Sequence, residues 1–319
     1  MPAILVHYTF AYRHMRDEAR PFEKAVCLGS QGPDSFFFYG YGLHNKKTRP
    51  NVKGIQEYGH YLHRLDISTV YPLFFEYANK SEYKDLIYAY VEGLLLHYSV
   101  DRNCHGFVFS RAGDNIGDPN DKVNWGVKHV QYEGMLDYCI GRKAGTWTRK
   151  TWNCLALDDN DLKEISKAWK YVNDNSVKTE GFDELTFYKA VKDFRFVRHL
   201  IDGCGALSGG FVRMVAGKNS VPYGLHLPKK MPKFLKDYDF MNAGHSEWQD
   251  PYDGSIHTET FPDMIHKSFP LYNSFVEMLE KAKNGEDVKD EFKSLVNGID
   301  HESSPNGAKR KFRSPIWKD

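Results

Sequence analysis

Apolar and polar positions along the chain recur at helical spacing over most of its length. In the segment 83–105, apolar residues fall three or four positions apart and so share one face of a helix. The same periodicity predicts helices over residues 1–20, 124–142, 161–173, 183–200 and 270–297, and the residues from Asp158 to Asp161 can cap the helix over 161–173. No series of alternating apolar and polar residues indicates a set of strands. We therefore expect an all-α fold.

Segments rich in glycine, proline and short polar residues separate these predicted helices, at residues 28–44, 106–123 and 216–236. In the first of them, Gly29, Gly32 and Pro33 predict a turn, and the aromatic run that follows would join this loop to a core. We expect one all-α domain over residues 1–300, with a motif-bearing half (1–145) and a helical half (155–300), followed by a frayed polar tail over 301–319.

The composition excludes several classes of partner and site. The chain carries 43 basic and 42 acidic residues, so no strongly charged partner is implied. Its 5 cysteines form no Cys-x-x-Cys pair, which argues against a thiolate zinc site and is typical of reduced thiols inside a cell. The first residues lack the features of a secretory signal, and no run of about 18 apolar residues predicts a membrane span. We expect a cytoplasmic protein with no obligate protein partner.

Five side chains that can bind metals lie close together in the sequence, at two sets of positions four residues apart. His97, Asp101 and His105 would share one face of the first helix, and His129 and Glu133 would share one face of the next. Because eight residues of helix rise about 12 Å, His97 and His105 are too far apart to bind one ion at about 2 Å. The pattern therefore predicts at least two metal ions, with Asp101 between them.

Further candidate ligands lie upstream in the sequence. Asp34 follows the Gly-Pro turn, His60 and His63 lie in Gly-His-Tyr-Leu-His, and His7 lies in the first predicted helix. A single histidine is more often a core or surface residue than a ligand, so the joint pattern carries the argument. Structural zinc sites usually recruit cysteines, whereas histidine and carboxylate ligands with an open position favour catalysis. A buried structural metal site remains the alternative.

Four segments in this order carry a resemblance to a known family. They are Met-Pro-Ala-Ile-Leu-Val-His (1–7), Gly-Ser-Gln-Gly-Pro-Asp-Ser-Phe-Phe-Phe-Tyr (29–39), Gly-His-Tyr-Leu-His (59–63) and the segment 93–105 with Gly93 and the three predicted ligands. Together they resemble the zinc-dependent phospholipase C and P1-type nuclease superfamily, and in particular its unsecreted bacterial branch. The resemblance covers roughly residues 1–140, and the stretch from Asn242 to Pro251 is also similar.

The resemblance implies a multi-helix bundle around a centre of two or three zinc ions that hydrolyses phosphate esters. By the same resemblance, the first ion would be bound by Asp34, His63, His97 and Asp101, the second by His105, His129 and Glu133, and a third by His7 and the second oxygen of Asp101 together with the N-terminal amine and carbonyl. Two features depart from the secreted members. The gap between Asp101 and His105 is shorter, and no N-terminal tryptophan is present, so removal of Met1 would be needed to expose Pro2 as the chelating terminus.

These observations predict hydrolysis of a phosphodiester by a metal-bound hydroxide, with zinc as the expected metal and manganese or iron possible. Asp34 is expected to accept a proton as well as to bind metal. Asp137, one turn beyond the predicted ligand Glu133, and His60 are expected to orient ligands from behind. Phe36 and Trp248 are candidates for lining a substrate pocket, although the aromatic run at Phe36 is more simply part of the core.

The sequence leaves the substrate open between a phospholipid head group and a nucleotide-type phosphodiester, so nucleic acid is implied only as a substrate. One alternative from another class is a non-catalytic binding or scaffold protein that the metals stabilise. A di-iron oxidase is a second alternative, and it is disfavoured because the Glu-x-x-His spacing of such proteins is missing from the two ligand-bearing helices.

Overall fold

The computed structural model describes residues 4–15, 21–42, 48–113, 124–148, 150–203, 225 and 238–312. Their helices are α1 (Ile4–Met15), α2 (Glu23–Gly29), the 3-10 helix η1 (Gly32–Phe38), α3 (Val52–Arg64), η2 (Ile67–Thr69), α4 (Pro72–Ala78), α5 (Lys84–Ala112), α6 (Trp125–Ala144), η3 (Thr151–Leu155), α7 (Asp159–Asp174), α8 (Thr186–Gly203), α11 (Phe261–Lys283) and α12 (Lys289–Val296). Two short strands, β1 (Trp248–Gln249) and β2 (Ile256–His257), pair antiparallel. The structure is mostly helical, which confirms the predicted all-α class.

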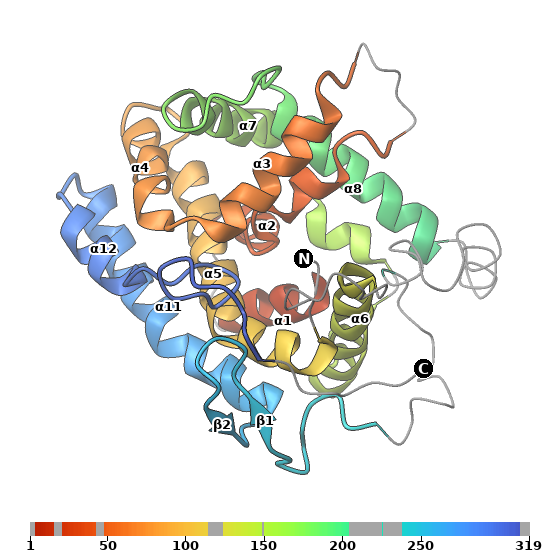
Figure 1. Ribbon diagram of the computed structural model, residues 1–319. Helices are drawn as coiled ribbons and strands as arrows, with labels where there is room; N and C mark the ends of the chain where they lie inside the picture. Colours follow the sequence, from red (N-terminus) through yellow and green to blue (C-terminus); the bar gives the residue numbers. More distant parts are fainter. Residues whose placement is uncertain are drawn as a thin grey trace.

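Helix α5 is the central element of the arrangement (Figure 1). It spans 29 residues, and apolar residues on all of its sides are buried, which is typical of a helix inside a core. Helices α1, α2, α4, α6, α7 and α11 all contact it. The residues that α5 carries are therefore held by neighbours on several sides.

Helices α2 and α5 cross at two glycines. A Cβ atom on Gly93 would lie 2.2 Å from the carbonyl oxygen of Val26, and one on Gly29 would lie 2.1 Å from the carbonyl oxygen of Tyr90. Any side chain at either position would therefore push the two helices apart. The close crossing brings the chain that follows α2, which forms η1, against the middle of α5.

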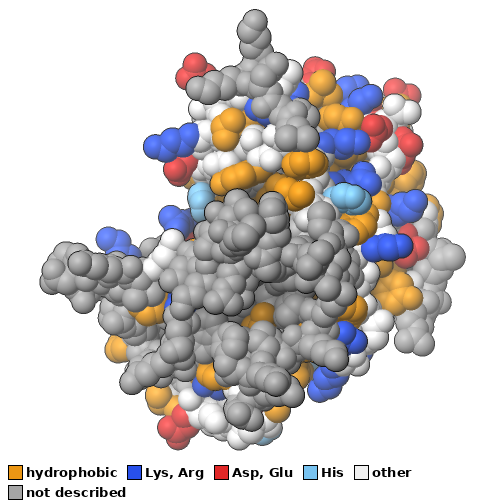
Figure 2. Space-filling model, turned by 90° about the vertical axis from the view of Figure 1, so that its right-hand side faces the viewer, with side chains coloured by type: hydrophobic (Ala, Val, Ile, Leu, Met, Phe, Trp, Pro, Cys, Tyr) orange, Lys and Arg blue, Asp and Glu red, His pale blue; other side chains and the backbone are white. Residues whose placement is uncertain are grey.

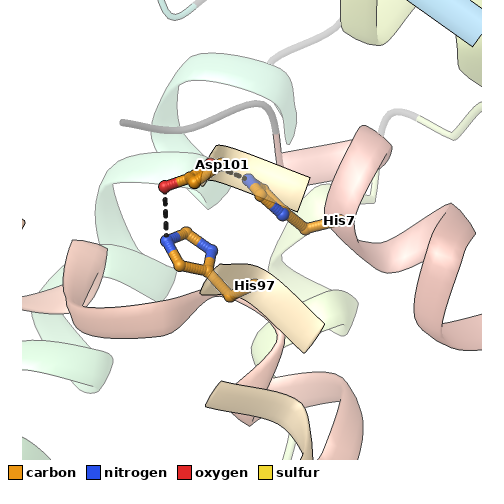
Figure 3. A group of neighbouring side chains, drawn as sticks. All are labelled: His7, His97 and Asp101. Carbon is orange, nitrogen blue, oxygen red and sulfur yellow. Dashed lines mark ion pairs between the residues drawn. The ribbon is translucent and has the colours of Figure 1, made fainter. Parts of the chain in front are cut away.

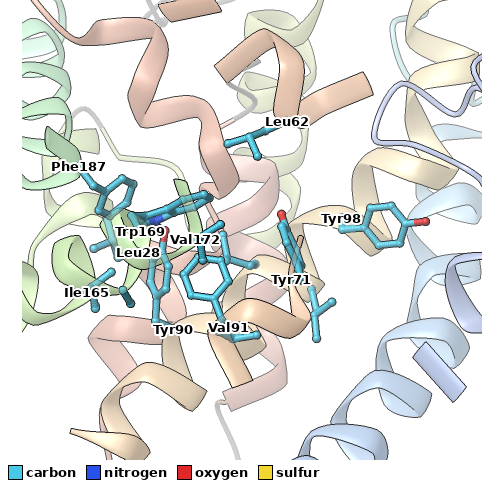
Figure 4. Packing of buried hydrophobic residues seen from close by; sticks show 14 of the residues in the cluster. Leu28, Leu62, Tyr71, Tyr90, Val91, Tyr98, Ile165, Trp169, Val172 and Phe187 are labelled. Atoms are coloured by element: carbon cyan, nitrogen blue, oxygen red, sulfur yellow. Dashed lines mark hydrogen bonds between the residues drawn. The ribbon is translucent and has the colours of Figure 1, made fainter. Parts of the chain in front are cut away.

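A dense aromatic core lies between α5, α7 and α8 (Figure 4). The buried Trp169 packs against Phe187, and its indole Nε1 donates a hydrogen bond of 2.8 Å to the hydroxyl of Tyr90. Phe36 is fully buried here, edge-on to Trp169, and its role in lining a substrate pocket stays a prediction. Trp248 is also buried, against Phe107 in a second core cluster, and its pocket-lining role likewise stays a prediction.

Several predicted boundaries differ from those in the structure. Helix α5 continues to Ala112, past the loop predicted from residue 106, because apolar side chains such as Phe107 and Val108 continue its buried face. The helix predicted over 270–297 is two helices, α11 and α12. Thr260 and Asp263 form a capping box that starts α11, which accommodates Pro270 in its interior. Within the predicted loop at 28–44, the structure has the end of α2 and η1. Residues 114–123 and most of 216–236 lie outside the described residues.

The chain after α12 forms a hairpin, which we call the C-terminal hairpin and define as residues Gly298 to Asn306. Ile299 and Pro305 form an antiparallel bridge, and the amide of Asn306 donates a 2.7 Å hydrogen bond to the carbonyl of Gly298. The sequence predicts a frayed tail from residue 301, whereas His301 is 0% exposed. Residues 313–319 of the predicted tail lie outside the described residues.

The described surface carries both signs of charge. Figure 2 shows basic and acidic side chains among apolar and uncharged ones on one face of the molecule, which agrees with 43 basic and 42 acidic residues in the sequence. Among the described residues, no helix combines the length and the apolar character that crossing a membrane requires.

The glycine crossing can be tested by substitution. We expect Gly93→Ala to lower the free energy of unfolding by about 2 kcal/mol or more, because the added methyl group overlaps backbone atoms of α2. Gly126→Ala on α6 is the matched control. Its Cβ would meet only a side-chain oxygen at 3.6 Å, so its stability should be unchanged or up to about 1 kcal/mol higher. Urea unfolding followed by circular dichroism measures both, and equal stabilities would contradict a crossing that depends on glycine.

Candidate metal centre

The first group of potential ligands joins α1 to α5. Asp101 lies one turn after His97 on α5, and its Oδ2 is 2.9 Å from His97 Nε2. Its other oxygen, Oδ1, is 3.1 Å from Nε2 of His7 on α1. Figure 3 shows the carboxylate between the two imidazoles, whose ring centroids are 4.2 Å apart. All three side chains are buried.

The second group brings η1 and α3 to the same helix. Asp34 in η1 places Oδ1 3.0 Å from Nε2 of His63 on α3, and both lie with His97 in one cluster of potential ligands. Gly32, with φ of 57°, allows this approach, because a Cβ there would lie 2.4 Å from His97 Nε2. His97 therefore belongs to two groups, which share its imidazole.

The third group joins α5 to α6. Glu133 Oε1 lies 3.1 Å from Nε2 of His129 one turn earlier on α6, and 3.5 Å from Nε2 of His105 on α5. Asn124 caps α6 by accepting a hydrogen bond from Val127, which starts the helix just before His129. His105 also lies near the first group, since its Nδ1 is 3.7 Å from Asp101 Oδ1.

The spacing of these atoms matches that of ligands around a shared cation. Ligands at bond lengths of about 2.0–2.1 Å in a tetrahedral shell lie roughly 3.3 Å apart. The nitrogen–oxygen pairs within the groups are separated by 2.9 to 3.5 Å. Within the described part of the chain, His63 Nε2, His97 Nε2 and Asp101 Oδ2 are buried and have no hydrogen-bond partner of good geometry. Buried polar atoms that converge in this way fit a bound metal ion, which would supply the missing interactions.

Three of the imidazoles are oriented by main-chain carbonyl groups. The Nδ1 atoms of His63, His97 and His105 lie 2.8, 3.1 and 2.6 Å from the carbonyl oxygens of Gly59, Ser30 and His301, respectively. A carbonyl oxygen only accepts hydrogen bonds, so each Nδ1 carries the proton. In the neutral imidazole, Nε2 is then free to bind a cation, which is the arrangement that histidine ligands of metals usually have.

Electrostatic interactions within the cluster favour an ionised Asp101 and a neutral His97, which can bind cations, but a protonated His105. Burial opposes the charge of Asp101, yet the imidazoles of His97, His105 and His7 lower its pKa well below the usual value. Burial also lowers the pKa of His97, which keeps that ring neutral. For His105, burial is outweighed by Asp101 and Glu133, which raise its pKa to about 9. Binding of a cation at His105 would therefore release a proton.

Asp137 positions the helix that carries His7. Its Oδ1 accepts hydrogen bonds of 2.9 and 2.8 Å from the amides of Leu5 and Val6, in the first turn of α1. These amides have no partner within their own helix, so Asp137 on α6 acts as their cap. Burial raises the pKa of Asp137 to about 8, against the opposing effect of the two amides. Asp137 thus caps α1 at Leu5 and Val6, the two residues directly before His7, and its expected role in orienting a metal ligand stays a prediction.

The remaining predicted site residues lie outside the three groups. His60 is exposed, and its ring packs 4.6 Å from that of Phe37, which in turn lies 5.2 Å from the ring of His63. Met1 and Pro2 lie outside the described residues, so chelation by the N-terminus stays a prediction.

The carbonyl groups of Ser30, Gly59 and His301 could not be predicted from the sequence as parts of the site. A main-chain carbonyl has the same chemistry in every residue, so no residue type marks it. Pro305, Asn306 and Gly307 do indicate a turn, but they do not show where that turn packs.

No protein-family model, no curated protein and no solved structure matches this chain. The described residues by themselves show three clusters of histidine and carboxylate side chains that could hold metal ions. They are His7, His97 and Asp101; Asp34, His63 and His97; and His105, His129 and Glu133. All of these residues except the partly exposed His129 are buried.

The protonation of Asp137 predicts a pH dependence of stability. Its pKa in the folded protein, about 8, exceeds the ordinary value of 3.8, so the folded state binds this proton more tightly than the unfolded state. Stability should then fall as pH rises between these two values. Asp137→Asn cannot ionise and keeps an acceptor for both amides. Relative to this variant, the free energy of unfolding of the wild type should fall by up to about 1.4 kcal/mol for each unit that the pH rises within that window.

Urea unfolding at several pH values measures this difference. Asp137→Ala is the second variant, and it should be less stable than Asp137→Asn at every pH, because it leaves the amides of Leu5 and Val6 without their acceptor. A constant difference between the wild type and Asp137→Asn from pH 4 to pH 8 would show that Asp137 does not hold a proton in the folded state.

Proposed function

We propose that this protein is a metal-dependent phosphoesterase that hydrolyses a phosphodiester at a centre of two or three zinc ions. The observation that carries the proposal is the set of three histidine–carboxylate clusters joined along α5. Asp101 has one oxygen beside His97 and the other beside His7, so it is suited to bridge two neighbouring ions. Closely spaced cations of this kind are typical of enzymes that cleave phosphate esters.

When bound, the cations would lower the pKa of a water molecule and neutralise charge that develops on the phosphate. The protein's own residues hold and orient this centre. Burial opposes ionisation of Asp34, but His63 and His97 help to lower its pKa well below the usual value. An ionised carboxylate of such low basicity is better suited to bind a cation than to accept a proton. The role of Asp34 as proton acceptor stays a prediction.

We infer further that the chain has the bundle of the zinc-dependent phospholipase C and P1-type nuclease superfamily. The resemblance assigns His63, His97, Asp101 and Asp34 to one ion, and these side chains lie together around α5. It assigns His105, His129 and Glu133 to a second ion, and they form a separate cluster. This agreement between the motif and the clusters supports the proposal.

Zinc is the preferred metal because imidazole and carboxylate ligands suit it, although manganese and iron bind the same ligand types. The substrate class is a phosphodiester, either a phospholipid head group or a nucleotide-type ester. Phe36 and Trp248, the two candidates for lining a substrate pocket, are both buried and indicate no preference between these substrates. A cytoplasmic location is part of the proposal, and the described cysteines Cys27, Cys104, Cys139 and Cys154 are free thiols in keeping with it.

Zinc binding should stabilise the fold. A ligand that binds only the folded state at about 100 times its dissociation constant adds about 2.7 kcal/mol to the free energy of unfolding for each independent site. We expect protein stripped of metal by a chelator to unfold at lower temperature, and added Zn²⁺ to restore the higher value in differential scanning calorimetry. Mg²⁺ is the control ion, because it prefers oxygen ligands and should shift the temperature little. A melting temperature that responds to none of Zn²⁺, Mn²⁺ and Fe²⁺ would oppose a metal centre.

Activity is tested with bis-p-nitrophenyl phosphate and added Zn²⁺ or Mn²⁺. The wild-type protein should release p-nitrophenol, and His97→Ala should lose about 100-fold or more of this activity. His97 lies in two clusters, and mutation of a residue that only supports a metal ligand already lowers metal affinity or activity by about 10–100-fold.

His266→Ala is the matched control, since this histidine is exposed on α11 and should leave the rate unchanged. If wild type and His97→Ala are equally inactive on phosphoesters while metal removal still lowers the melting temperature, the alternative of a non-catalytic, metal-stabilised binding protein is correct.

A further inference from the structure

The C-terminal hairpin contacts two ligand residues through the main chain of a single residue. The carbonyl oxygen of His301 accepts the 2.6 Å hydrogen bond from Nδ1 of His105 on α5. The amide of His301 donates a 3.2 Å hydrogen bond to the carbonyl of His63 on α3. His105 and His63 belong to different clusters, so one residue of the hairpin joins the two.

The side chain of His301 packs against His63 and His97, two members of the His63 cluster. Its ring is fully buried, with its centroid 5.2 Å from that of His63 and 5.6 Å from that of His97. It also packs edge-on against Tyr98 at 5.1 Å, and its Nε2 lies 3.4 Å from the hydroxyl of Tyr71. His301 is not a member of the three ligand clusters among the described residues, so it supports ligands from behind.

Ser303 makes a second contact, with the turn of α5 that carries the ligands. Its Oγ accepts a 3.0 Å hydrogen bond from the amide of Gly106 and lies 3.4 Å from the carbonyl of Asp101, to which it donates. Gly106 directly follows His105. The serine hydroxyl thus links the two backbone positions that set the direction of Asp101 and His105.

The hairpin is held in this place by further polar contacts. The hydroxyl of Tyr98 donates a 2.6 Å hydrogen bond to the carbonyl of Ile299. On the other side, Glu302 pairs with Arg64 at the end of α3 and with Arg310. The hairpin is therefore tied to both of the helices whose ligand residues it contacts.

We propose that the C-terminal hairpin is a clamp that fixes the geometry of the His105 cluster relative to the His63 cluster, with His301 and Ser303 as positioning residues. It sets the direction of the His105 ring through a carbonyl group and the local path of α5 through a hydroxyl group. Disrupting the hairpin's contacts should weaken metal binding while the protein is still folded. This inference rests on the proposed metal centre.

The test compares metal affinity in full-length variants. Each protein is stripped of metal and titrated with Zn²⁺ in competition with a chromophoric chelator, and its Co²⁺ form is examined by visible absorption. Ser303→Ala should weaken at least one zinc site by about tenfold or more and change the Co²⁺ bands, as is usual when support behind a ligand is lost. Ser304→Ala is the matched control, because the Ser304 hydroxyl donates its hydrogen bond to the carbonyl of Ala308 and not to α5. This variant should keep its zinc affinity within about twofold of the wild type.

A second pair of variants keeps the test decisive if Ser303→Ala folds poorly. Tyr98→Phe removes the hydroxyl that donates to Ile299 and accepts a hydrogen bond from Arg102, and it should likewise weaken zinc binding. Tyr90→Phe removes a buried hydroxyl that lies eight residues earlier on the same helix and accepts a hydrogen bond from Trp169, and it should leave zinc binding unchanged. Wild-type affinity and Co²⁺ spectra in both Ser303→Ala and Tyr98→Phe would overturn the clamp, and so would equal losses in the two controls.

The outcomes also separate the clamp from the proposed function. If the wild type binds zinc and hydrolyses phosphodiesters while Ser303→Ala and Tyr98→Phe bind zinc equally well, only the clamp is wrong. If the wild type binds zinc without hydrolysis and these two variants bind it more weakly than their controls, only the hydrolytic function is wrong. If the wild type binds no metal, both are wrong.

Discussion

Burial of ionisable side chains along α5 is the constraint on which the rest of the structure depends. A carboxylate that loses its water is destabilised by several kcal/mol unless partners of opposite charge and hydrogen bonds compensate. Asp101 is 4% exposed in the middle of the core, and the surrounding elements supply that compensation. Helix α1 contributes His7, and α5 itself contributes His97 and His105. The contacts that pack these helices around α5 therefore also assemble the candidate centre.

The parts of the centre that are local in sequence could be predicted from the sequence. A spacing of four residues places His97, Asp101 and His105 on one helical face, because that spacing is a property of the helix itself. Helix ends were harder to predict than these ligand positions. The capping box at Thr260 is a recognisable start signal, and the prediction missed it by following apolar periodicity from residue 270. The extension of α5 to Ala112 depends on tertiary burial of its last turns, which periodicity alone does not report.

Two further features could not be predicted from residue types. An aromatic residue looks the same in the sequence whether its side chain lines a pocket or packs in a core. Only the folded structure shows its surroundings, and Phe36 and Trp248 both pack into cores. The grouping of Asp34, His63 and His7 with the helix came from a resemblance between motifs, since their distances along the chain imply nothing about contact. Their approach depends on small residues such as Gly32, whose missing side chain leaves room for His97.

The order in which the chain is synthesised gives the C-terminal hairpin a further meaning. The clustered side chains all lie between His7 and Glu133, so they leave the ribosome while most of the helical second half is still unmade. The carbonyl group that orients His105 belongs to His301, which is made much later than any of these side chains. If the hairpin acts as proposed, tight capture of metal has to wait until the hairpin has been made. Translation products that stop before the hairpin would then compete poorly for scarce zinc in the cell, even though they contain all of the clustered side chains.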